Sequence, residues 1–193
     1  MLVTIFKLKE ITLLQFFRLI SSSRFCWFLL LVVAVALEAC GLYFQYRLSL
    51  NPCIECVYER AYFLGFVLIG FIGALTANFW ISRLICALAF VACSVGGFFT
   101  ALSHYNAYTS NNMFGQSCKL QANFPDFLKL DEIAPWMFKP IGLCSDKLDW
   151  SFFGQSMPFW ILFIFFVSII VSVCMTVGLF VPHKAKNFKK LYR

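Results

Sequence analysis

Residues 158–181 read PFWILFIFFVSIIVSVCMTVGLFV, an apolar run without a single charged side chain. A transmembrane helix needs about 20 consecutive apolar residues, and this run meets that requirement. Three further stretches, residues 25–46, 58–77 and 84–102, are predominantly apolar and also long enough. None shows the alternation of period 2 that is typical of a membrane barrel. Because backbone polar groups in lipid must be satisfied within the segment, the sequence predicts four transmembrane helices.

The composition agrees with a membrane protein. Of the 193 residues, 61% are hydrophobic and only 13% are charged, so a polar surface cannot cover the chain. The length predicts one domain, a single integral membrane domain over residues 1–193. The net charge of +7 comes largely from the two tails and not from a polar folded segment, which argues against a nucleic-acid partner. These basic side chains indicate contacts with lipid headgroups. They are Lys7, Lys9, Arg18, Arg24, Lys184, Lys186, Lys189, Lys190 and Arg193.

The distribution of Lys and Arg also predicts the topology. The basic tails 1–24 and 182–193 are expected on the cytoplasmic side, and the less biased loops 47–57 and 103–157 on the outer side. Residues 1–24 lack the apolar core and cleavage site of a removable signal peptide, and they suit either an interfacial helix or a basic tail. The predicted fold is therefore an all-α membrane protein, a four-transmembrane-helix bundle with two outer, periplasmic loops.

The nine cysteines divide by depth. Four lie in the outer loops: Cys53, Cys56, Cys118 and Cys144. An even number of thiols on an outer face predicts disulfides, and four cysteines permit three pairings. The adjacent pair can close without moving the chain, which leaves Cys118 with Cys144. A disulfide between Cys53 and Cys56 would close a very small ring and would constrain little chain entropy, so this pair is predicted to be reactive rather than structural. The other five are expected to be inert apolar fillers. These five are Cys26, Cys40, Cys86, Cys93 and Cys174.

A zinc site is the alternative use of the outer thiols. Cys53, Cys56, Cys118 and Cys144 could form a four-thiolate site in principle. Cys118 and Cys144 lack the close spacing that usually sets up such a site, and an oxidising compartment disfavours free thiolates. We therefore predict no metal.

The residues around Cys56 favour thiol chemistry. Pro52 fits the entry to a helix, and a sulfur near the first turn lies by unpaired backbone N–H groups. Arg60, four residues after Cys56, can lie on the same helix face and stabilise a thiolate or donate to an oxygen of a bound ligand. The alternative for Arg60 is an anchor at the membrane interface. Glu55 opposes a thiolate.

Three further ionisable residues have two interpretations each. Glu59 either partners Arg60 or caps the helix. Glu38, inside the first span, is either a functional group or part of an interhelical hydrogen bond. His104, just past the third span, either donates to a ligand near the outer surface or is an ordinary loop histidine.

From about Cys26 onwards the chain resembles the DsbB family of bacterial inner-membrane disulfide-bond oxidoreductases. The resemblance rests on short motifs in a fixed order, with a single cysteine on either side of the stretch 124–131. The motifs are Ala36-Leu37-Glu38, Tyr43-Phe44-Gln45, Pro52-Cys53, Cys56-Val57-Tyr58-Glu59-Arg60, Phe124-Pro125, Leu130-Asp131, Asp149-Trp150, Phe153-Gly154 and Met157-Pro158.

The resemblance implies a four-helix bundle that reoxidises a periplasmic DsbA-like thiol oxidase with a membrane quinone, ubiquinone or menaquinone. On this basis Cys118 forms the mixed disulfide with the partner, and Cys144 is the cysteine paired with it. Electrons then pass to the pair Cys53–Cys56, of which Cys56 engages the quinone.

The resemblance also implies a quinone-binding role for Arg60, His104 and Met157. The chain departs from the family at Glu55, where an apolar residue is usual, and in an extension of about a dozen residues at the N-terminus. Two other functions stay open. One is a non-catalytic membrane scaffold with structural disulfides, and the other is a DsbI-like paralogue that serves a dedicated partner.

Overall fold

The computed structural model describes residues 17–18, 20–109, 123–125, 128–142 and 151–180. Within these ranges the chain forms four long helices, α2 (Arg24–Arg47), α3 (Ile54–Thr76), α4 (Trp80–Thr109) and α7 (Met157–Phe180). Each is long and apolar enough to cross a membrane. The predicted fold class, an all-α membrane protein built on four such helices, is confirmed.

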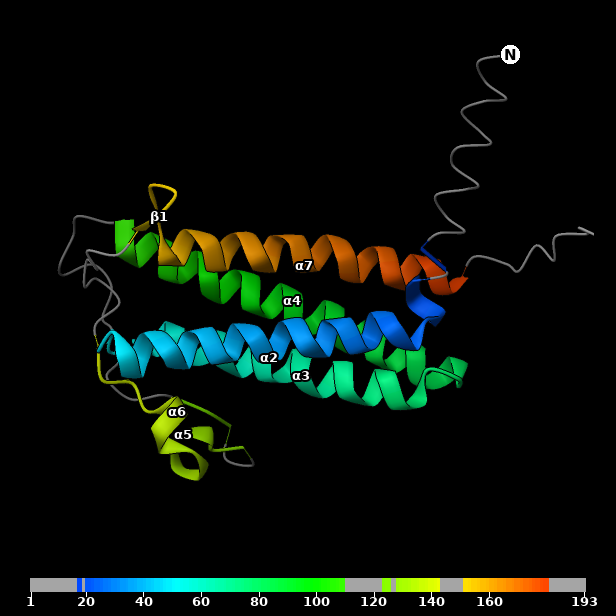
Figure 1. The fold of residues 1–193 in the computed structure, drawn as a ribbon, viewed down its shortest axis with the longest axis horizontal. Helices are drawn as coiled ribbons and strands as arrows, with labels where there is room; N and C mark the ends of the chain where they lie inside the picture. Colours follow the sequence, from blue (N-terminus) through cyan, green and yellow to red (C-terminus); the bar gives the residue numbers. More distant parts are fainter. Residues whose placement is uncertain (1–16, 19, 110–122, 126–127, 143–150, 181–193) are drawn as a thin grey trace, which may run out of the picture.

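The four helices run side by side as an antiparallel bundle (Figure 1). The close helix pairs are α2–α3, α3–α4 and α4–α7. Helices α2 and α4 finish at the end of the bundle where α3 and α7 begin, and we call this the thiol end (residues 47, 54, 109 and 157). At the opposite end α2 and α4 begin and α3 and α7 finish.

At the thiol end the helices extend beyond the predicted spans. Helix α3 begins at Ile54 rather than at residue 58, because Cys53 serves as its N-cap. Helix α4 continues to Thr109 rather than ending at residue 102. Its 30 residues correspond to about 45 Å, more than the roughly 30 Å of the hydrocarbon core. His104 therefore lies on a rigid helix and not in a loop.

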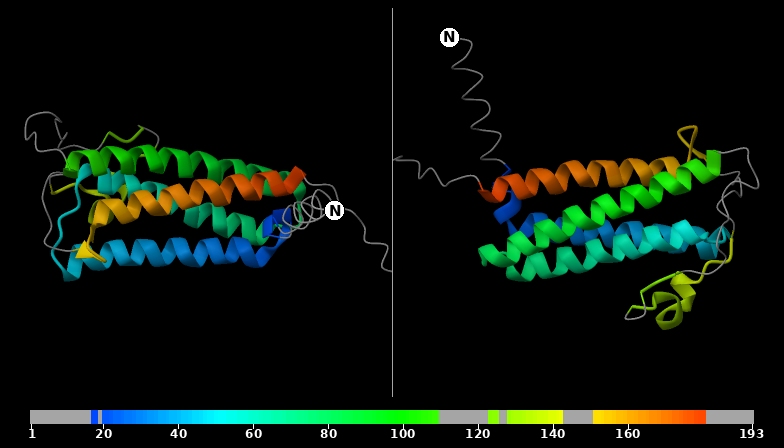
Figure 2. Two further views of the ribbon diagram at one scale, coloured as in Figure 1. Left: turned by 90° about the horizontal axis from the view of Figure 1, so that it is seen from above. Right: turned by 180° about the vertical axis from the view of Figure 1, so that it is seen from behind.

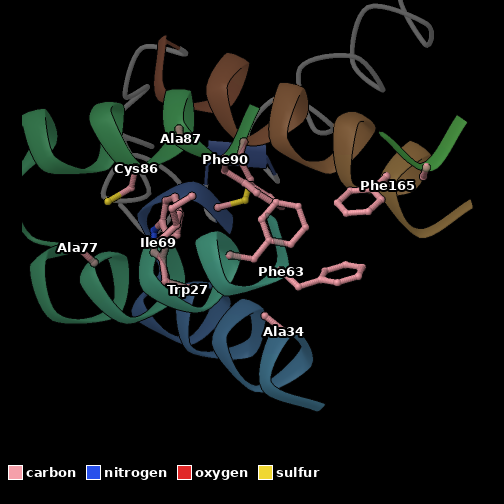
Figure 3. Packing of buried hydrophobic residues seen from close by; sticks show 12 residues of the cluster. Trp27, Ala34, Phe63, Ile69, Ala77, Cys86, Ala87, Phe90 and Phe165 are labelled. Atoms are coloured by element: carbon pink, nitrogen blue, oxygen red, sulfur yellow. The ribbon is translucent and has the colours of Figure 1, made fainter. Parts of the chain in front are cut away.

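Aromatic side chains fill the centre of the bundle. The rings of Phe63 and Phe165 are stacked with centroids 4.7 Å apart, and Phe66 meets Phe90 edge-on at 5.0 Å. Trp27 is fully buried in the same cluster, which draws on all four helices (Figure 3). Such offset and edge-on pairs add to the energy of burial and fix the helix register.

Glycines allow the helices to approach closely. A Cβ atom at Gly70 of α3 would lie 2.7 Å from the backbone nitrogen of Leu31 in α2. A Cβ atom at Gly97 of α4 would overlap the ring of Phe165 in α7. Small residues at such positions are typical of packed membrane helices.

Part of the connection between α4 and α7, the segment of residues 128–142, packs against the thiol end. Two short helices, α5 (Leu130–Ile133) and α6 (Pro135–Phe138), lie beside the start of α3 (Figures 1 and 2). Their apolar contacts gather around Val57, which is fully buried. The backbone N–H groups of Ile141 and Gly142 donate to the Pro52 carbonyl at 2.9 and 3.0 Å. The loop is thereby tied to the residue that precedes Cys53.

A small hairpin precedes α7. Strands β1 (Ser151–Phe152) and β2 (Gln155–Ser156) pair antiparallel around Phe153 and Gly154, whose φ angles are 50° and 73°. Positive φ at both central residues is characteristic of a tight hairpin turn, and the glycine adopts it without strain. The sequence lacks an Asn-Gly or Asp-Gly signal there, so this hairpin was not predicted.

Candidate active site

The sulfurs of Cys53 and Cys56 lie 2.7 Å apart at the start of α3. Cys53 is the N-cap, and its sulfur accepts the backbone N–H of Cys56 at 3.3 Å. The expectation that a helix-start N–H group lies by the sulfur of Cys56 is met through the backbone of Cys53, and the sulfur of Cys53 also accepts such a group. Because the pair bridges the cap and the first turn, loss of two hydrogens can close a disulfide without rearranging the helix.

A histidine and a glutamate support the two sulfurs. Nε2 of His104, on α4, lies 3.6 Å from the Cys53 sulfur and 3.8 Å from the Cys56 sulfur. The opposite ring nitrogen, Nδ1, donates to Oε1 of Glu59 at 2.9 Å. Glu59 and His104 are 2% and 6% exposed, so the pair is isolated from water. A base next to a thiol, oriented by a third group, is the arrangement that activates nucleophiles.

Arg60 connects three parts of the chain. Its guanidinium donates to the Gly41 carbonyl of α2 at 3.0 Å and to the Met137 carbonyl of α6 at 2.9 Å. It also donates to the side-chain oxygen of Gln45. Arg60 is 9% exposed, so these are buried, charge-assisted bonds. The side chain therefore holds α2, α3 and the segment 128–142 together beside the thiols.

A cavity of about 170 Å³ adjoins the dithiol between α2, α3 and α7. Its walls are mostly apolar, and the sulfur-bearing residue Cys56 contributes to them. An apolar cavity of about 150 Å³ in a protein accommodates a benzene ring. The polar residues in its wall are few: Glu38, Gln45, Asn51, Glu59 and Arg60. The cavity thus suits a flat apolar ring with a small number of hydrogen-bonding atoms.

Comparison with known proteins assigns the family. The family model described as Disulfide bond formation protein DsbB matches residues 23–175. The chain belongs to the DsbB family. It is 42% identical to Disulfide bond formation protein B of Mannheimia succiniciproducens, over 83% of this chain and 90% of that protein. It is 35% identical to the proteins of the same name from Histophilus somni and Psychromonas ingrahamii, over 94% and 95% of this chain and 100% and 98% of those proteins.

The resemblance inferred from the sequence is therefore confirmed, and the chain is a disulfide-forming membrane oxidoreductase of the DsbB family. Of the residues predicted for its site, Cys56, Arg60 and Met157 line the cavity. His104 does not line it and contacts the two sulfurs instead. Cys118 and Cys144 lie outside the described residues, and their pairing stays a prediction.

One expectation about the neighbouring acids is wrong. Glu59 neither partners Arg60 nor caps the helix, and it binds His104. Adjacent helical residues point in different directions, so Glu59 faces α4 while Arg60 faces α2. Glu55 accepts a hydrogen bond from the Ser103 hydroxyl at 3.1 Å. The sequence missed Gln45 as a site residue, although it lies one turn beyond Gly41 on the helix face that meets Arg60.

Three potential metal ligands also meet at this site. The sulfurs of Cys53 and Cys56 and a ring nitrogen of His104 lie within 4.8 Å of one another. A structural zinc site takes four protein ligands. Among the residues that the structure describes, this cluster offers three ligands, one fewer than a structural zinc site takes.

Proposed function

We propose that the chain is a quinone-dependent thiol oxidoreductase that reoxidises a periplasmic DsbA-like dithiol oxidase. Electrons pass from the partner to the disulfide Cys118–Cys144, then to the disulfide Cys53–Cys56, and finally to ubiquinone or menaquinone in the membrane. In this proposal the protein lies in the bacterial inner membrane, with both termini in the cytoplasm and the cysteine pairs on the periplasmic side.

The observation that carries the proposal is the position of the vicinal thiols. Their sulfurs are 2.7 Å apart, and Cys56 opens into an apolar cavity between membrane helices. Such an apolar cavity favours an oxidant with a lipid-soluble ring over a polar, water-soluble oxidant. A quinone supplies the capacity to accept two electrons and two protons. Arg60 and Met157, both in the cavity wall, are the residues proposed to hold it.

His104 is assigned the task of moving a thiol proton. With Nδ1 held by Glu59, Nε2 faces both sulfurs and can accept the S–H proton of either cysteine. The resulting imidazolium, 3.8 Å from the Cys56 sulfur, stabilises the thiolate that performs exchange. In this proposal His104 acts on the sulfurs and not as a wall of the quinone site.

The charge distribution supports the proposed orientation. In the sequence the basic residues 1–24 lead into α2 and 182–193 follow α7, and Arg83 lies near the start of α4 at the end opposite the thiols. The positive-inside rule assigns that end to the cytoplasm. The thiol end then faces the oxidising compartment in which disulfides persist.

Trapping tests the route of the electrons. A DsbA-like protein with a single active-site cysteine should attack the Cys118–Cys144 disulfide in membranes and stay on Cys118 as a mixed disulfide, with Cys144 released as a thiol, detectable by non-reducing electrophoresis. Quinone-linked oxidation of that partner should fall to background in Cys56→Ser and stay normal in Cys174→Ser, a control in α7. Full turnover in Cys56→Ser would refute the route. Four outer cysteines that stay oxidised, without a mixed disulfide, would instead identify a scaffold.

A further inference from the structure

Glu38 is a buried acid without a partner. It lies in the middle of α2, is 8% exposed, and neither carboxyl oxygen has a hydrogen-bond partner within the described part of the chain. The interhelical hydrogen bond considered for this residue is therefore not found. Burying a polar group without a partner is costly, and ionisable groups inside membrane segments are commonly functional.

The Glu38 side chain belongs to the wall of the cavity that Cys56 enters. Glu38, Gly41 and Gln45 follow the spacing of one helix face, and all three line the cavity from α2. Cys56 and Arg60 line it from α3. Glu38, whose carboxyl has no partner, and Cys56 thus line the same apolar cavity.

The nearby cation does not neutralise Glu38. Arg60 directs its guanidinium to the Gly41 carbonyl and the Gln45 side chain, and among the described residues no ion pair involves Glu38. An ionised carboxylate would therefore stand in an apolar wall without compensation, whereas a protonated carboxyl carries no charge and offers one O–H donor. The complement of that donor is an acceptor oxygen on the molecule that enters the cavity.

We propose that Glu38 is protonated and donates its proton to an oxygen of the quinone as the dithiol is oxidised. This inference rests on the proposed function. The balance closes: Cys53 and Cys56 lose two electrons and two protons, and the quinone takes up the same numbers to become the quinol. Glu38 gives one proton and regains one of those that the thiols release, so it ends the cycle as it began.

The first test is spectroscopic and independent of turnover. The infrared spectrum of purified wild type minus that of Glu38→Gln should show the carbonyl stretch of a protonated carboxylic acid. The band should shift when a short-chain ubiquinone is added to the oxidised protein. Glu132→Gln, the same change at an exposed site of α5, should remove no such band. Absence of the band from the wild-type difference spectrum would overturn the proposal.

The second test separates binding from proton transfer. Glutamine keeps the shape of Glu38 and can donate a hydrogen bond, but it cannot release a proton. In Glu38→Gln the affinity for short-chain ubiquinone, measured by equilibrium dialysis, should stay within about threefold. Reduction of that quinone by the dithiol should slow by about 100-fold, the usual contribution of a general acid. Reduction within threefold of wild type would overturn proton donation.

The two proposals fail in different ways. If wild type binds no ubiquinone and oxidises no partner, the proposed function is refuted, and the proton donation that rests on it is refuted as well. If wild type binds and reduces ubiquinone while Glu38→Gln does so at the same rate, only the role of Glu38 is refuted. A Glu38→Leu variant shows whether the helix pair tolerates loss of the carboxyl. Its thermal unfolding should match that of wild type, and its reduction of ubiquinone should also be slow.

Discussion

Replacing Arg60 by Met should release the segment 128–142, which contains α5 and α6, from the bundle. The guanidinium is the only cation that the structure places between α2, α3 and α6 among the described residues, and its bond to the Met137 carbonyl ties α6 to α3. Met keeps much of the apolar stem but has no donor. The segment then keeps the bonds from Ile141 and Gly142 to the Pro52 carbonyl. It also keeps the bonds from Gln45 and Tyr46 to the Trp136 carbonyl.

The size of the effect follows from the bonds that are lost. The Gly41 carbonyl lies inside α2 and keeps its helical partner, so the bond to Met137 dominates the loss. A hydrogen bond with one charged partner contributes about 1.5–3 kcal/mol. Since about 1.4 kcal/mol corresponds to tenfold, local opening of the segment should become roughly 10–150 times more frequent.

Amide hydrogen exchange measures this opening. In Arg60→Met the amides of Ile141 and Gly142 should exchange faster by the factor given above, whereas those in the middle of α3 should be unchanged. Lys129→Met is the matched control, because Lys129 is an exposed cation of the same segment that contacts Glu132 at 3.2 Å. Exposed pairs contribute little, and this variant should stay within threefold. Exchange in Arg60→Met that matches the control would refute the role of Arg60 as a tie.

Four further substitutions test other parts of the structure. Gly142→Ala places a Cβ atom 2.5 Å from a backbone oxygen of the 47–53 connection. Because this displaces the segment that leads to Cys144, electron transfer between the two cysteine pairs should slow by about tenfold or more. Direct quinone reduction by the Cys53–Cys56 dithiol should keep its wild-type rate. Electron transfer between the pairs at the wild-type rate would contradict this. Gly70→Ala should destabilise the bundle by about 1–3 kcal/mol in unfolding measurements, because its new Cβ meets backbone. Gly65→Ala should lower the free energy of unfolding by less, because its new Cβ meets only the side chain of Cys93. A larger loss in Gly65→Ala than in Gly70→Ala would contradict this account of the helix packing. Glu59→Gln should slow thiol alkylation of the reduced pair by about 10–100-fold, because glutamine can still accept from Nδ1 of His104 but lacks the negative charge that makes the imidazole a stronger base. An unchanged rate would exclude that support.

The helices were predictable because lipid imposes a simple requirement. A run such as residues 158–181 has no charged side chain and no alternative to a helix in a bilayer. The ends of the helices were less predictable, because they depend on capping and not on hydropathy. Cys53 caps α3 through its own sulfur, and α4 continues past residue 102 into polar residues that still form helical hydrogen bonds.

From the residue pattern alone, the candidate site was predictable only where its residues are close in sequence, whereas Met157 was predicted through the family resemblance. The spacing of Cys53 and Cys56 indicated a reactive pair without any knowledge of the fold. The contact of His104 with Glu59 depends on the register between α3 and α4, which aromatic and glycine packing sets in the middle of the bundle. No local pattern contains that register, so the sequence could not identify which of two roles His104 has.

The burial of Cys53 explains why the proposed function needs a second pair of cysteines. Cys53 is 3% exposed, and Cys56 faces a cavity between membrane helices. Thiol–disulfide exchange requires the attacking sulfur to reach a disulfide sulfur directly, which a folded, water-soluble partner cannot do there. A carrier on the outer segment can meet such a partner, and the ties from Gly142 to Pro52 and from Met137 to Arg60 hold that segment against the start of α3. In the proposed function, the burial that protects the Cys53–Cys56 dithiol from soluble thiols makes it depend on Cys118 and Cys144 for its electrons.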